Sequence, residues 1–150
     1  MKKIIVTGLI FMAFGIGIGE KFYRNKDKIS NVFNEGEIYY FLQEGVYTSK
    51  EIMEENTKNI AIKAIEKQND KYYVYLGITK NEKIAKKIKN IYEKKGYQIY
   101  LKEVKLNNEE FSSNIAQFDL LLNSTEKDDE ILTIIEVILA NYEEIIQKSS

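Results

Sequence analysis

The segment IYYFLQEGV, residues 38–46, and the segment KYYVYLGI, residues 71–78, determine the predicted fold. A shift of 32 residues places the first on the second, so that Tyr40 matches Tyr72 and Gly45 matches Gly77. Aromatic and β-branched residues favour strands, and glycine often ends them. The sequence therefore predicts an internal repeat whose unit is strand, glycine turn, helix and second strand.

The segments between these strands complete each unit. Residues 49–59 follow Thr48 or Ser49, either of which is a suitable N-cap, and residues 80–95 carry apolar side chains at a spacing of three to four before Gly96. Weaker strand patterns cover residues 59–67 and 98–105, and Asn69-Asp70 is a turn signal. The predicted class is α+β, a ferredoxin-like βαββαβ domain with a four-stranded antiparallel sheet and two helices on one face.

Strand side chains alternate between the two faces of a sheet. The helices need an apolar face, which Leu42, Val74 and Leu76 supply. The opposite face is then expected to be open and rich in aromatic groups that suit sugar rings, with an amide for sugar hydroxyls. The candidate glycan-binding residues are Tyr39, Phe41, Gln43, Tyr73 and Tyr75, and the fourth strand adds Tyr100 and Lys102. The alternative, that these aromatic residues simply pack beneath the C-terminal helices, stays open.

The glycine-ended strands, with Gln43 near the first glycine and a second helix ending in Lys95-Gly96-Tyr97, resemble a SPOR domain over residues 37–105. The sequence departs from that pattern at Ile78-Thr79, where the family has proline, and at Glu44, where it has an apolar residue. The resemblance implies binding to peptidoglycan glycan strands. It also implies a single-pass membrane protein of the bacterial cell envelope, in cell division or sporulation.

Residues 106–150 contain ten acidic residues and two lysines, a net charge of −8. Two amphipathic stripes are separated by a polar turn at 123–129, for which Asp128 or Asp129 is the expected N-cap of the second helix. A short loop between such helices predicts an antiparallel hairpin. We expect it to dock on the domain, whose residues 80–105 carry nine lysines and three glutamates, or to bind a protein partner or a second copy. The stripes are formed by Phe111, Ile115, Phe118 and Leu122, and by Ile131, Ile135, Ile138, Tyr142 and Ile145.

The first residues predict membrane targeting. Lys2-Lys3 precede an uncharged run from Ile4 to Gly19, which is followed by a charged segment. Residues 1–19 are interpreted as a transmembrane anchor or a cleaved signal segment, and residues 20–36 as a juxtamembrane linker. Both interpretations put the rest of the chain outside the cytoplasm, because lysines before the run favour a cytoplasmic N-terminus.

Composition excludes several classes of function. The chain of 150 residues has neither cysteine nor histidine, which removes thiolate chemistry and the commonest general base and metal ligand. Its formal net charge of −1 argues against a nucleic-acid binder. Adjacent carboxylates such as Glu54-Glu55 do not face each other on a helix. No catalytic residue, metal site, cofactor or nucleic-acid partner is therefore expected.

The leading hypothesis is a membrane-anchored, extracytoplasmic peptidoglycan-binding protein. The alternative is a non-catalytic protein-interaction scaffold at the membrane surface that binds no glycan. The position of the C-terminal hairpin distinguishes them. A hairpin on the helical side leaves the aromatic face free, whereas a hairpin over Phe41 and Tyr73 removes the glycan site.

Overall fold

A computed structural model describes residues 36–149. The predicted anchor at 1–19 and nearly all of the predicted linker at 20–36 lie outside these residues. Within the described part of the chain, no helix is both long enough and apolar enough to span a bilayer.

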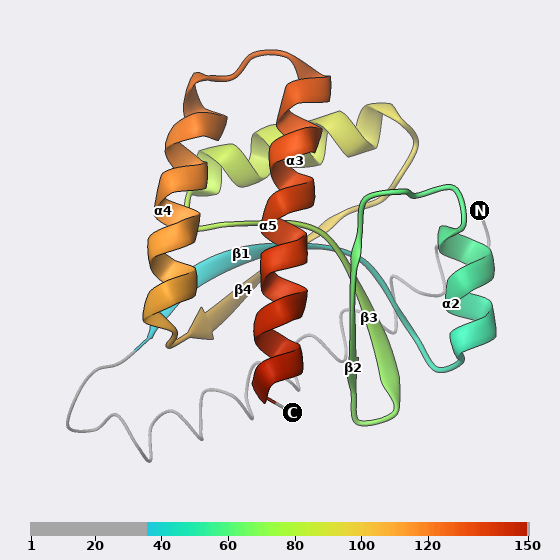
Figure 1. Cartoon of the computed structure of the whole chain (residues 1–150). Helices are drawn as coiled ribbons and strands as arrows, with labels where there is room; N and C mark the ends of the chain where they lie inside the picture. Colours follow the sequence, from blue (N-terminus) through green and yellow to red (C-terminus); the bar gives the residue numbers. More distant parts are fainter. Residues whose placement is uncertain (1–35, 150) are drawn as a thin grey trace.

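Eight elements make up the described chain, and the first six follow one another as β-α-β-β-α-β (Figure 1). The strands form one antiparallel sheet in the order β2-β3-β1-β4. The class is therefore α+β, as predicted. The elements are β1 (Glu37–Tyr47), α2 (Lys50–Thr57), β2 (Ala64–Gln68), β3 (Lys71–Thr79), α3 (Glu82–Lys94), β4 (Tyr100–Leu106), α4 (Glu109–Ser124) and α5 (Asp128–Ser149).

The 32-residue repeat is present in the backbone. β1 ends at Tyr47 and β3 at Thr79, and α2 and α3 begin at Lys50 and Glu82, which keeps the same interval. The helix caps also correspond. The Ser49 hydroxyl accepts a hydrogen bond from the Ile52 N–H at 3.3 Å, and the Asn81 side chain accepts from the N–H groups of Lys83 and Ile84 at 2.8 and 3.2 Å.

Two local predictions about turns are confirmed. Gly96 has a φ of +97° just beyond α3, in the conformation that glycine adopts most easily after a helix. Asn69 and Asp70 both have positive φ and connect β2 to β3, as in a tight hairpin turn.

The predicted positions of the repeat glycines and of one cap are wrong. Gly45 and Gly77 lie inside β1 and β3 rather than in turns after them, because both strands continue for two more residues. At Gly77 an added Cβ would lie 3.3 Å from Leu42 Cδ1 and 3.4 Å from Ile88 Cγ2, so the glycine lets α3 approach the sheet closely. Asp128 and Asp129 lie in the first turn of α5, not before it.

The sheet is covered on both faces. Leu42 and Gly77 face Ile88 of α3, so α3 lies on their side of the sheet. On the opposite side α5 crosses β2 and β3, with α4 beside it (Figure 1). We call α4 and α5, residues 109–149, the C-terminal hairpin. The prediction that the second sheet face is open to solvent is therefore wrong.

Ile88 provides a test of the core beneath α3. Its side chain is fully buried, whereas Ile52 on α2 is about half exposed. Ile88→Ala should lower the free energy of unfolding by about 2–5 kcal/mol, because it removes buried methylenes and leaves a cavity. Ile52→Ala should cost less than about 1 kcal/mol. Urea denaturation of both variants measures the difference, and equal losses would contradict this placement of α3.

Candidate functional site

The aromatic residues predicted to bind glycan do share one face, but it lies under the C-terminal hairpin. Tyr142 of α5 packs edge-on against Phe41 and Tyr75, with ring centroids 5.2 and 6.3 Å apart. Phe111 of α4 lies 5.5 Å from Tyr39. All five predicted site residues are at most 3% exposed: Tyr39, Phe41, Gln43, Tyr73 and Tyr75. A glycan strand cannot reach them in this arrangement.

Alternation explains why the five residues lie together. Phe41 pairs with Ile78 and Gln43 with Tyr75 across the β1–β3 ladder, so these side chains point to the same side. The register shifts around Gln43, where Glu44 and Leu76 are additional residues in the two strands. The extra residue in β3, Leu76, puts Tyr75 and Tyr73 on the face of Phe41. Here the predicted parity is confirmed.

A polar cluster is enclosed within this aromatic layer. Lys102 of β4 is 5% exposed, and its Nζ lies 3.3 Å from the Tyr75 hydroxyl and 4.9 Å from the Tyr73 ring centre. On the other edge of the sheet, the Tyr142 hydroxyl donates to Glu66 Oε1 at 2.7 Å. Within the part of the chain that the structure describes, the Gln43 side-chain amide has no hydrogen-bond partner. We call Gln43, Glu66, Tyr75, Lys102 and Tyr142 the buried polar cluster.

Burial controls the ionisation of this cluster. It lowers the pKa of Lys102 to about 8, against a smaller opposing effect of the Glu66 carboxylate. Burial also raises the pKa of Glu66, although the hydrogen bond from Tyr142 and the charge of Lys102 partly oppose this. The pKa values of Tyr75 and Tyr142 lie well above their usual range, mainly because of burial. The cluster therefore has one buried base, Lys102, and one half-buried acid, Glu66.

Glu66 and Tyr142 were not among the predicted site residues. A signal for Glu66 existed, because it alternates with Ala64 on the strand beside Tyr73 and Tyr75. Tyr142 stood out as the one hydroxyl-bearing member of its predicted apolar stripe. Neither signal says that the two side chains meet, because 76 residues separate them.

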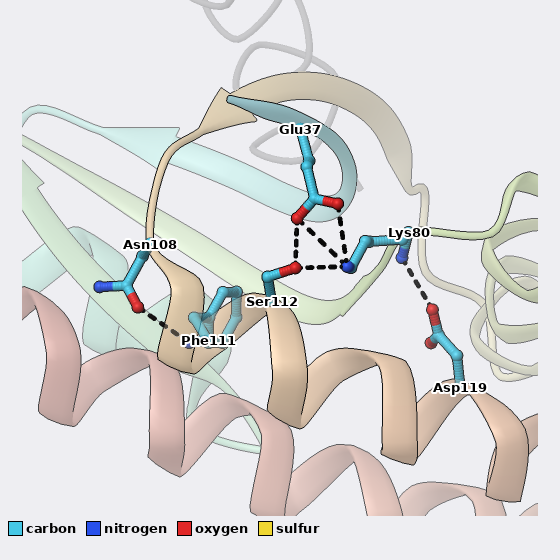
Figure 2. Close-up of polar contacts among 6 residues, drawn as sticks. All are labelled: Glu37, Lys80, Asn108, Phe111, Ser112 and Asp119. Atoms are coloured by element: carbon cyan, nitrogen blue, oxygen red, sulfur yellow. Dashed lines mark hydrogen bonds and ion pairs between the residues drawn. The ribbon is translucent and has the colours of Figure 1, made fainter. Parts of the chain in front are cut away.

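A second set of polar contacts holds the start of α4 to the sheet (Figure 2). Lys80 Nζ lies 2.6 Å from the Ser112 hydroxyl and 3.3 Å from the Glu37 carboxylate, and Ser112 also donates to Glu37. The Asp119 carboxylate accepts from the Thr79 hydroxyl at 2.6 Å and from the Lys80 N–H at 3.0 Å. Together they connect α4 to the first residue of β1 and the last of β3.

α5 is fastened to the edge strand in a different way. The Glu143 carboxylate accepts from the Ile65 N–H of β2 at 3.1 Å, which satisfies a donor on the outer edge of the sheet. The Asn114 amide donates to the Asn141 side chain at 3.1 Å and fixes the register of the two hairpin helices. The hairpin is therefore bonded to the sheet at two places: α4 at the start of β1 and the end of β3, and α5 at the edge strand β2.

The described residues contain no group of three metal-ligating side chains close enough to hold an ion. No family model, no curated protein and no solved structure matches this chain.

Lys102→Met tests the buried polar cluster. The folded-state pKa of Lys102 is lowered from 10.5 to about 8, so the unfolded chain binds more protons between these values and stability rises with pH across them. From about pH 7 to about pH 9.5 the free energy of unfolding should rise by about 1–2 kcal/mol in the wild-type protein. Lys102→Met keeps the aliphatic part of the side chain but removes the ammonium group, so the free energy of unfolding of this variant should not rise across the same pH range. Urea denaturation of both proteins at the two pH values measures this difference. An equal rise in the variant would contradict the assignment of the pH dependence to Lys102.

Proposed function

We propose that this protein is a non-catalytic interaction module of the bacterial cell envelope, held at the membrane by residues 1–19 with its folded part outside the cytoplasm. The observation that carries the proposal is the packing of Tyr142 against Phe41 and Tyr75. It fills the surface on which a glycan would lie. A scaffold that binds proteins is then favoured over one that binds glycan in its resting form.

The outer side of the C-terminal hairpin supports this choice. Leu120 and Leu121 of α4 and Val137 of α5 are 73%, 52% and 49% exposed. Exposed large apolar side chains that cluster on a surface are characteristic of protein interfaces. The hairpin thus has one apolar side for its own domain and a smaller one for a partner or a second copy.

We propose further that the sheet domain is ferredoxin-like. The order β2-β3-β1-β4 with a β-α-β-β-α-β sequence of elements supports this arrangement. We also propose that this domain is related to SPOR domains, and this proposal rests on the repeated glycine-containing strands.

One observation favours glycan binding as a second candidate function. The Gln43 amide is fully buried and, within the described chain, has no hydrogen-bond partner. An unpaired buried amide costs about 1–3 kcal/mol, which would be recovered if a sugar hydroxyl bound there. This function would require the C-terminal hairpin to leave the sheet.

Retention on purified peptidoglycan sacculi separates the two candidates. The full chain in non-ionic detergent should not be retained. Tyr142→Ala removes the ring that covers Phe41 and Tyr75. If this substitution exposes a glycan site, the variant should be retained on the sacculi. Leu120→Ala, on the outer side of the hairpin, is the control and should behave as the wild type. Retention of the wild-type chain would contradict the scaffold proposal, and retention of Tyr142→Ala alone would establish the second candidate.

The proposed orientation has its own test. Protease added to intact spheroplasts should degrade residues 37–150, because a lysine-flanked N-terminal segment favours a cytoplasmic N-terminus. A cytoplasmic marker protein should stay intact in the same sample. Full protection of the chain until the membrane is permeabilised would contradict the outward orientation.

A further inference from the structure

A groove with a volume of about 440 Å³ lies beside the buried stripe of α3, between this helix and the start of α5, and does not involve the aromatic face of the sheet. Ile91 contributes to its lining, and Asp128, the first residue of α5, lies at one wall. We call it the lysine groove. The remaining lining residues are Lys83, Lys86, Lys87, Asn90 and Lys94.

Lys87 builds one wall of the lysine groove. Its Nζ donates to the backbone carbonyls of Leu122 and Thr125 at 3.0 and 2.6 Å, at the end of α4 and in the loop that follows. These bonds satisfy carbonyls that a helix end leaves unpaired. They also hold the hairpin loop against α3, so the groove has a fixed second side.

Three of the lysines follow one line along the helix. Lys83, Lys87 and Lys94 are spaced at intervals of four and seven, with Asn90 between the last two, which keeps them on the same side of α3 over about 16 Å. Lys83 and Lys94 have no ion pair with any residue in the described part of the chain. Lys86 lies 3.5 Å from Glu82, but both side chains are more than half exposed, and such pairs are weak.

We propose that the lysine groove binds a linear anionic chain of phosphate or phosphodiester groups. Four ammonium groups against the single carboxylate of Asp128 give the groove a strong positive potential, and ammonium groups bind phosphate as point charges without demanding one geometry. The straight line of charges suits successive phosphates along a chain. None of the described lining residues is aromatic, so the groove offers no ring on which nucleic-acid bases stack.

This inference does not rest on the proposed function. The glycan candidate uses the opposite face of the sheet, and a protein partner would use the apolar side of the hairpin. Residues 106–150 carry a net charge of −8, but of the described lining residues only Asp128 belongs to the hairpin. A polyanion in the groove would therefore lie along the lysines of α3.

Binding of a fluorescent linear inorganic polyphosphate to the full chain in non-ionic detergent tests the proposal. Lys83→Gln combined with Lys94→Gln should weaken binding about 10- to 30-fold, since each lysine near an anionic surface contributes roughly a factor of five. The slope of log affinity against log salt should also become shallower by between one and two. Lys50→Gln combined with Lys58→Gln, at the first residue of α2 and just after its last, removes the same charge from exposed positions elsewhere and should leave both quantities unchanged.

Three outcomes would overturn the proposal. The first is equal weakening by the α2 control, which would mean that net charge alone determines binding. The second is no measurable binding of polyphosphate by the wild-type chain at low salt. The third is binding to phosphatidylglycerol vesicles without binding to polyphosphate, which would assign the lysines to bilayer headgroups instead. Circular dichroism of both double variants confirms that each retains the fold.

Discussion

The contact of the Tyr142 ring with Phe41 and Tyr75 is the interaction on which the rest of the structure depends. A four-stranded sheet covered on one face only would expose a continuous aromatic surface, larger than soluble domains usually tolerate. The C-terminal hairpin covers it with the apolar stripes of α4 and α5. Aromatic rings bury much area and favour edge-on contacts, so this layer supplies both stability and a defined position for the hairpin.

Local features of the fold could be predicted from the sequence because local chemistry determines them. Ser49 caps α2, Gly96 takes a positive φ after α3, and Asn69 and Asp70 form the β2–β3 turn, each through its own backbone preferences. The repeat was also visible, because equal spacing in sequence gives equal lengths of strand and connection. Errors occurred where a strand continued beyond its expected end, as at Gly45 and Gly77, since pairing with the neighbouring strands outweighs the weak strand propensity of glycine.

The candidate site could be predicted only in part. Alternation along β1 and β3 correctly grouped Phe41, Gln43 and Tyr75, but parity says which residues share a side and not what packs on that side. What packs on that side is determined by contacts between residues far apart in the sequence, such as Tyr142 with Glu66 and Glu143 with Ile65. The apolar stripe of α5 was clear from its spacing, yet it would fit any apolar surface, and several were available.

The position of Tyr142 after all four strands in the sequence has a consequence for biosynthesis. Synthesis proceeds from the N-terminus, so β1 to β4 are complete before α5 has been made. Until α5 has been made, Tyr142 cannot pack on the face that holds Phe41, Tyr73 and Tyr75, and the nascent domain exposes an apolar aromatic surface. Loss of residues 143–150 would leave Tyr142 in place, whereas a stop codon before Tyr142 would release a product that aggregates or is degraded. The aromatic face is therefore covered only once α5 has been synthesised.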